Sequence, residues 1–358
     1  MASKRVWGLC LTVLLLGGTG IMSSKAAPNK VVRILQTNSA GDNVQIIDPA
    51  INKVVGEITG IEVNHGVVAA PDGSRIYITC EAESTLDVAD ARTLKVVNKI
   101  PLSGHPNNLT VSPDGRRVYV AIANAPGGVD VIDTGSLKDV KTIRTKGPIH
   151  NPYVTPDGKF VVAGSTQSNV INVIDTKTEE LAWTVQEDKG IRPMAFATNP
   201  DGSTKWIFVQ LTAFDGFAVV DFAAREEIKR IDYPDLPAGR SPVPVGATRT
   251  NPGTSAVGGA DPSHGLAVTS DGKILVANSR LNSALYLYSL PDLKLAGTVF
   301  LSGKGAAWVT LTPDGQTAYV SNAVTNDVSV VSLKSMKEIT RIPVGFVPKR
   351  NGTGILQE

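Results

Sequence analysis

Short apolar runs alternate with polar turns along most of the chain, and the same order of runs recurs about every 43 residues. Each unit begins with an apolar run, continues through a Pro-Asp-Gly or Ser-Asp-Gly turn, and returns in a second apolar run. An Asp-Gly pair supplies the left-handed backbone that a tight hairpin needs. The pattern therefore predicts tandem β-hairpins. The turn aspartates are Asp72, Asp114, Asp157, Asp201, Asp271 and Asp314.

The spacing of these turns sets the size of the repeat. Successive turn aspartates are 42, 43, 44, 70 and 43 residues apart, so one interval holds an insertion of about 27 residues. A third run ends 18 to 20 residues after each turn, and a fourth run follows it, as at 95–101 and 338–344. Four short strands per unit at this period are typical of a β-propeller blade.

The number of blades follows from the third-strand ends, which occur at Asp48 and then once after each of the six turns. The first of these seven units lacks its opening strand. Segment 350–356 lies one repeat after the last turn and can supply that strand. We therefore expect an all-β, seven-bladed propeller of four-stranded antiparallel blades, with the ring closed by the C-terminal strand joining the N-terminal blade, which leaves no open sheet edge.

The repeats also resemble a known family. Segments 111–125, 154–175 and 311–333 resemble the YVTN family of propeller repeats, and Tyr319-Val320-Ser321-Asn322 nearly spells that name. The resemblance covers residues 31–356 apart from the insertion. It implies a bacterial repeat protein, periplasmic or secreted. Members include surface-layer proteins, lactonases and the propeller domains of haem, quinone and copper oxidoreductases, so the resemblance leaves the function open.

The N-terminus has the pattern of a secretory signal. Lys4 and Arg5 precede the apolar stretch 6–16, and Ser24-Lys25-Ala26 is a small-x-small cleavage site. We expect a signal peptide at 1–26, a single propeller domain at 27–358, and no membrane span after cleavage. Cys80 would then be the only cysteine, and the chain has no Cys-x-x-Cys-His motif, so we expect no covalent c-type haem.

Charge and composition narrow the possible partners. Without the three basic residues of the predicted signal, 32 basic residues face 33 acidic ones, so we expect no nucleic-acid partner. The segment at about 236–263 is rich in Pro, Gly, Ser and Thr and has no strand or helix period. We expect it to be a loop insert between blades 5 and 6. It is a lid, a contact for a protein partner, or a neutral surface insertion.

The four histidines all precede an inner strand. His65, His150 and His264 lie seven residues before their turn aspartates, and His105 lies nine before its own. We expect all four to line one mouth of the central channel, on the face that carries the insert. Three imidazoles with an open position are the usual ligands of a catalytic zinc or copper ion. The pattern favours a metal site with copper or zinc as the cofactor, in a periplasmic redox protein.

Other residues near the same mouth allow different readings. Cationic and polar side chains there could bind a small anionic ligand instead of a metal, or only water; these are Arg192, Lys304, Arg350, Asn107 and Tyr153. The alternatives are a metal-dependent oxidoreductase, a non-catalytic protein-interaction propeller, and a lactonase- or lyase-like enzyme that uses a histidine as general base on an anionic substrate. The sequence assigns no catalytic residue.

Overall fold

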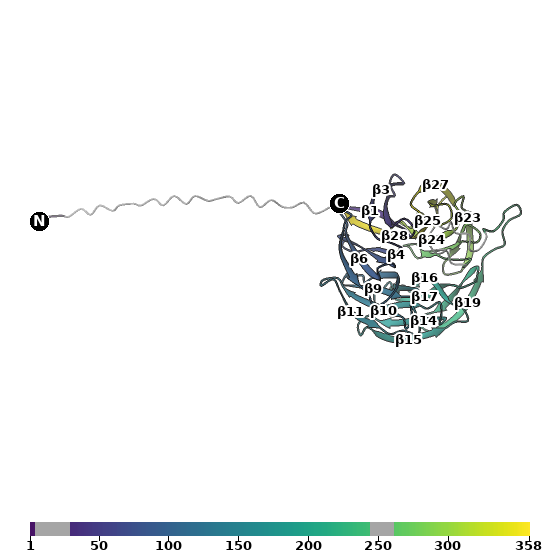
Figure 1. Cartoon of the computed structure of the whole chain (residues 1–358), viewed down its shortest axis with the longest axis horizontal. Coiled ribbons are helices and arrows are strands. Elements are labelled where there is room, and N and C mark those ends of the chain that lie inside the picture. The colour runs from purple at the N-terminus through teal and green to yellow at the C-terminus, as the bar shows by residue number, and fades with distance from the viewer. Residues whose placement is uncertain (4–28, 244–260) are drawn as a thin grey trace.

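A computed structural model describes residues 1–3, 29–243 and 261–358. In these ranges 28 strands form seven four-stranded antiparallel sheets, with no helix. The sheets are arranged as blades around a central channel (Figure 1). The predicted all-β, seven-bladed architecture is confirmed.

Each blade orders its strands from the channel outward. The innermost strands are β28 (Pro348–Gln357), β4 (Asn64–Ala69), β8 (Pro106–Val111), β12 (Asn151–Val154), β16 (Ile191–Thr198), β20 (Leu266–Val268) and β24 (Ala306–Leu311). The second strands are β1 (Lys30–Asn38), β5 (Arg75–Cys80), β9 (Arg117–Ile122), β13 (Phe160–Gly164), β17 (Thr204–Leu211), β21 (Ile274–Ser279) and β25 (Thr317–Asn322). The third strands are β2 (Asn43–Asp48), β6 (Thr85–Asp90), β10 (Gly128–Asp133), β14 (Val170–Asp175), β18 (Gly216–Asp221), β22 (Ala284–Ser289) and β26 (Asp327–Ser332). The outer strands are β3 (Lys53–Thr59), β7 (Val96–Pro101), β11 (Lys138–Ile143), β15 (Glu180–Gln186), β19 (Glu226–Asp232), β23 (Lys294–Phe300) and β27 (Lys337–Pro343).

The C-terminal strand closes the ring as expected. β28 pairs antiparallel with β1, with Leu356 opposite Val31 and Thr353 opposite Ile34. Figure 1 shows the yellow β28 beside the purple β1. Because the first and last parts of the chain share one sheet, their pairing closes the ring.

The core lies between neighbouring blades. The third strands are buried along almost their whole length, as in β6 and β14, because both of their faces pack against other blades. Outer strands such as β3 alternate exposed and half-buried positions. This difference explains why the sequence shows continuous apolar runs in the third strands and an alternation of apolar and polar residues in the outer strands.

The Asp-Gly turns have the geometry that the sequence predicts. Gly73 has φ of 79°, and the Asp72 carboxylate accepts a hydrogen bond of 2.9 Å from the Ser74 backbone N–H. That hydrogen bond lowers the pKa of Asp72. Repetition of this turn places the starts of all inner strands at the opposite face of the ring.

Two predicted segments lie wholly or partly outside the described residues. Most of the predicted signal peptide does, and so do residues 244–260 of the predicted insert. The described ends of the insert connect β19 to β20, between blades 5 and 6 as expected. In the described ranges, no helix is long and apolar enough to cross a membrane.

Candidate functional site

The inner-strand starts bring one ring of side chains together at the channel mouth. Each blade has one residue seven positions before its turn aspartate, and in blade 1 Gln357 takes the place of that aspartate. These residues are His65, Asn107, His150, Met194, His264, Ala307 and Arg350. Since the blades are repeats, these positions lie at one level of the channel. Contacts between blades that are not neighbours confirm the convergence. We call this region the histidine mouth.

Arg350 occupies the middle of the histidine mouth. Its guanidinium donates 2.7 Å and 2.8 Å hydrogen bonds to the side-chain oxygens of Asn151 and Asn107, and it lies 4.4 Å from the ring centre of Trp308. The side chain therefore extends from blade 1 to blades 3, 4 and 7. It is 1% exposed, and burial lowers the pKa of Arg350 to about 9. Arg350 places a positive charge across the channel.

His150 and His264 face each other across blade 5. Their ring centres are 5.5 Å apart in an edge-to-face arrangement. His264 Nδ1 lies 2.8 Å from the Ala307 carbonyl oxygen, which can only accept a hydrogen bond, so Nδ1 carries the proton and Nε2 keeps its lone pair. Burial is the main cause of the lowered pKa of both histidines. Both rings are therefore neutral at neutral pH.

The backbone around His264 is fixed by buried amides. Its N–H donates to Asn278, and the next N–H, from Gly265, donates to Gln210. Gly265 has φ of 155°, and a Cβ there would lie 2.8 Å from the Asn278 side chain. Only glycine satisfies both constraints, so the orientation of His264 is built into the strand start.

His65 has a different partner. Its Nδ1 contacts a carboxylate oxygen of Glu81, and the Lys349 ammonium lies 3.2 Å from the same ring nitrogen. The other oxygen of Glu81 lies 3.7 Å from Nε2 of His105, which is about half exposed. Burial and neighbouring cations lower the pKa of His65, and burial lowers that of Lys349 to about 7.

Two more arginines lie on the blade 5 and blade 6 side. Arg192 forms a 2.8 Å ion pair with the buried Asp261, and its Nε donates to the Thr212 hydroxyl. Arg280 follows β21 and acts electrostatically on Asp261 and His264, while burial lowers its pKa to about 10. In the described part of the mouth, four cationic side chains thus face two carboxylates: Arg192, Arg280, Lys349 and Arg350 against Glu81 and Asp261.

The predicted site residues divide into three groups. His65, His150, His264, Arg192, Arg350 and Asn107 lie in the histidine mouth. The Tyr153 hydroxyl accepts a hydrogen bond from the Met194 backbone at its edge. His105 is on the exposed rim, and Lys304 is exposed and lines a hollow with Asn282 and residues 239–243.

Several mouth residues were missed by the sequence analysis. Glu81 and Arg280 follow second strands, whose ends reach the same face as the inner-strand starts. Lys349 directly precedes the ring position of blade 1, and Trp308 directly follows that of blade 7. Asp261 lies at the end of the insert. The repeat register could have predicted all of these except Asp261, because the register applies to second strands as well as to innermost strands.

The four histidines do not form a compact ligand set. Among the described residues, one group of three potential metal ligands has all its ligand atoms within 4.8 Å of one another: Cys80, Glu83 and Asp87. It contains no histidine, and an ammonium already lies beside it, since Lys99 contacts both carboxylates.

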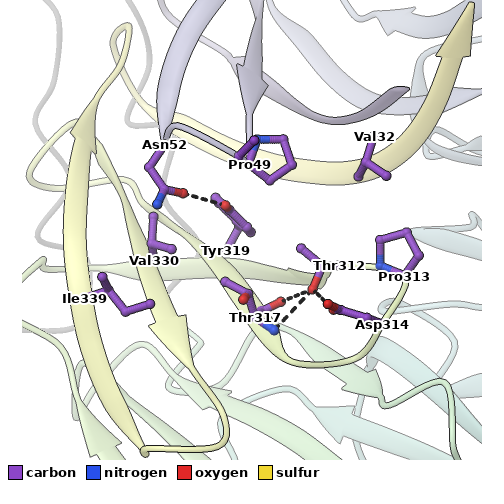
Figure 2. A pocket seen from close by; sticks show the side chains of 11 residues that line it. Val32, Pro49, Asn52, Thr312, Pro313, Asp314, Thr317, Tyr319, Val330 and Ile339 are labelled. Carbon is purple, nitrogen blue, oxygen red and sulfur yellow. Dashed lines mark hydrogen bonds between the residues drawn. The ribbon is translucent and has the colours of Figure 1, made fainter. Parts of the chain in front are cut away.

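A groove on the opposite side of the ring lacks comparable chemistry. It has a volume of about 390 Å³, lies between blades 7 and 1, and is bordered by the Asp314 turn (Figure 2). The Tyr319 hydroxyl donates a 2.6 Å hydrogen bond to Asn52 there. Much of the rest of the lining is apolar, so the histidine mouth is the better candidate.

Comparison with protein families gives one match. Residues 31–163, a little over a third of the chain, match the family described as the Cytochrome D1 heme domain. No curated protein matches the chain. The match covers blade 1 apart from β28, blades 2 and 3, and the start of blade 4, including His65, His105 and His150.

Solved structures share the propeller fold. Hydrazine synthase of Kuenenia stuttgartiensis superposes with a TM-score of 0.69 at 22% identity, covering 83% of this chain and 91% of that one. Dihydro-heme d1 dehydrogenase NirN in complex with DHE gives 0.63 at 16%, covering 89% and 74%. A putative 6-phosphogluconolactonase from Bacteroides fragilis gives 0.69 at 17%, covering 91% and 98%. At these identities the likeness shows the fold alone.

These findings correct the expected cofactor. Copper or zinc without covalent haem was expected, but the matched haem-domain family and the NirN complex point to a haem-type cofactor. The physical reason for the error is that the histidine pattern was read without its surroundings. Cationic side chains beside the imidazoles disfavour a bare metal ion, which brings no negative charge of its own. The comparisons do not show the YVTN repeat family, which stays a resemblance.

Proposed function

We propose that this propeller binds an anionic haem-type tetrapyrrole at the histidine mouth and acts as an exported redox or haem-handling protein. One observation carries the proposal: the buried Arg350 guanidinium contacts two side-chain amides and an indole at the mouth, and no carboxylate of the described residues forms an ion pair with it. Tetrapyrroles of the haem type carry carboxylate side chains. Such a ligand supplies the negative charge that the site lacks.

The electrostatic argument rests on the cost of burying charge. An uncompensated charge away from water is unfavourable, and like charges close together add to that cost. The pKa values of Arg350, Arg280 and Lys349 are all lowered, mainly by burial. Carboxylates accept short, charge-assisted hydrogen bonds from guanidinium and ammonium groups. Binding an anion therefore stabilises the buried charge of Arg350, which no described carboxylate balances.

His264 is the residue best prepared to hold an iron atom. Its Nδ1–H is donated to the Ala307 carbonyl, which leaves the Nε2 lone pair for a ligand. His150 lies beside it and has a buried Nδ1 without a hydrogen-bond partner in the described structure. A bound haem iron would supply electron transfer or the binding of a small molecule. The protein's own contribution is to orient a neutral imidazole and to anchor carboxylates.

The comparisons support this choice of ligand. The matched family is described as a heme domain, and NirN was solved in complex with DHE. Both associate this kind of propeller with a haem-type group. The periplasmic or secreted location remains a prediction from the N-terminal sequence.

A titration with haemin, iron protoporphyrin IX, tests the proposal. The purified mature protein should bind haemin stoichiometrically with a red-shifted Soret band, because His264 ligates the iron. The variant His264→Ala should lose the ligation spectrum and bind at least about 100-fold more weakly. His105→Ala, which alters an exposed rim histidine, is the matched control and should behave as wild type. No binding by the wild-type protein, or an unchanged His264→Ala spectrum, would contradict the proposal.

A second candidate function uses the same charges without iron. The fold is shared with a putative 6-phosphogluconolactonase, and the cations could hold an anionic lactone while His65 acts as general base. This function predicts that haem-free protein hydrolyses phosphorylated sugar lactones and that the variant His65→Gln has lost this activity. Absence of turnover in haem-free protein would exclude it.

A further inference from the structure

His65 is buried deeply and is not needed to ligate iron or to anchor a carboxylate. It is 3% exposed, and its Nδ1 is held by the Glu81 carboxylate. A carboxylate beside an imidazole orients the ring with Nδ1–H toward the carboxylate and leaves the Nε2 lone pair free to accept a proton. His65 therefore has the arrangement of a proton acceptor.

The free nitrogen of His65 is also buried. Nε2 has no hydrogen-bond partner within the described structure. The charged and titratable groups that act on the ring, besides Glu81, all belong to the histidine mouth: Lys349, Arg350, His150 and His264. The unpartnered Nε2 therefore belongs to the same cluster of side chains that the proposed ligand would contact.

Glu81 connects this buried ring to the surface. One of its oxygens contacts His65, and the other lies 3.7 Å from Nε2 of His105. The Glu81 side chain is 15% exposed and that of His105 is 48% exposed. Exposure thus rises stepwise from His65 through Glu81 to His105. Lys349 is the cation nearest to this series, 3.8 Å from Glu81.

We propose that His65, Glu81 and His105 form a proton-transfer path between a ligand in the histidine mouth and solvent. His65 Nε2 takes a proton from an acidic group of the ligand, which becomes one unit more negative. The Nδ1 proton of His65 passes to Glu81, a water molecule between Glu81 and His105 carries a proton across their 3.7 Å separation, and His105 releases one to solvent. No electron moves, and the reverse sequence delivers a proton to the ligand.

Lys349 adjusts this path without taking part in it. Its charge contributes to the lowered pKa of both His65 and His105, after the larger effect of burial. Both rings are therefore neutral at neutral pH, so neither ring retains the proton that it passes on. The role of a ligand rests on the proposed function, but the path itself is a property of the ligand-free protein.

Proton exchange in the ligand-free protein tests the path directly. The chain has four histidines, so the imidazole ¹⁵N signals of a labelled sample can be assigned by substitution. His65 should show an Nδ1–H tautomer whose proton exchanges with water despite its burial. Glu81→Gln and His105→Gln should slow this exchange at least 10-fold. The matched control is Glu83→Gln, an exposed carboxylate in the same loop that pairs with Lys99, and it should leave the rate unchanged.

The outcomes separate this inference from the proposed function. His105 is on the surface, so His105→Gln should fold normally and bind haemin as wild type does. An Nε2–H tautomer of His65 would overturn the path, because Lys349 would then be the partner of Nδ1. Exchange that is equally fast in His105→Gln would also overturn it. Neither result bears on whether haemin binds at His264.

Discussion

The molecule buries unbalanced charge in two regions. The charge can be neutralised by a proton in one region, whereas the other region needs an anion. In the outer halves of the blades, carboxyl groups lie in pairs: Glu187 with Glu227, and Asp130 with Asp139. Burial and the neighbouring Glu227 raise the pKa of Glu187 to about 8, and burial with Asp130 raises that of Asp139 to about 6. In the histidine mouth, cations are in excess instead. In both regions, groups of like charge interact electrostatically.

The difference lies in what can remove the charge. A carboxyl pair can hold one proton, which turns repulsion into a hydrogen bond, so it needs no external ligand. Arginines cannot lose their protons at physiological pH, so among the cations of the mouth only Lys349, with a pKa of about 7, can become neutral. The cation excess persists until an anion binds. Of two buried charge clusters, the one that cannot neutralise itself is the better candidate for a ligand site.

The largest effect on stability should come from Arg350. Replacing it with Met leaves the side-chain oxygens of Asn107 and Asn151 without their donor, which costs roughly 1–3 kcal/mol each. Relief of repulsion between cations offsets part of that cost. We expect the free energy of unfolding in urea to fall by about 2–4 kcal/mol. A stability equal to wild type would mean that Arg350 does not bridge the blades.

The carboxyl pair should respond to pH in a defined direction. The folded state holds the Glu187 proton up to about pH 8, whereas the unfolded state releases it near its ordinary pKa of about 4.5. Stability should therefore fall as pH rises through this window. Glu187→Gln should raise the free energy of unfolding by about 1–3 kcal/mol at pH 8 and leave it unchanged at pH 4. The haemin affinity of Glu187→Gln should equal that of wild type. A different affinity would show that the carboxyl pair and the histidine mouth are not independent.

Lys349 should give a smaller effect of opposite sign. The folded state loses its ammonium proton near pH 7, while the unfolded state keeps it to about pH 10.5. The contribution of Lys349 therefore makes stability rise between these values. Its side chain is partly exposed, so we expect a rise of about 1–2 kcal/mol. Lys349→Met should remove it, as measured by urea unfolding at pH 7 and pH 9.5.

The fold could be predicted almost completely because it depends on local signals that repeat. The Asp-Gly turns fixed the hairpins, and the position of segment 350–356 predicted the closing strand, which the pairing of β28 with β1 confirms. The same register placed His65, His150, His264 and Arg350 together. It could not show that Arg350 extends to Asn107 and Asn151, because side-chain reach across a channel has no sequence signal.

The chemistry of the site was predicted less well. Histidines in register suggested copper or zinc, but what an imidazole does depends on its partner. His264 donates to a backbone carbonyl and His65 contacts a carboxylate, and neither partner is close in sequence. Arg280 and Glu81 come from second strands, so attention to inner strands alone left the excess of positive charge unseen. A sequence analysis that places second-strand ends on the same face would have found it.

The central claim is that the cations of the histidine mouth recognise the carboxylates of a tetrapyrrole. The most direct test compares binding of metal-free protoporphyrin IX with that of its dimethyl ester, by quenching of protein fluorescence at pH 7. The two compounds share the macrocycle and differ in the charge that the ester removes. We predict at least about 100-fold weaker binding of the ester, since hydrogen bonds to charged groups contribute about 1.5–3 kcal/mol each. Equal affinities would contradict the account.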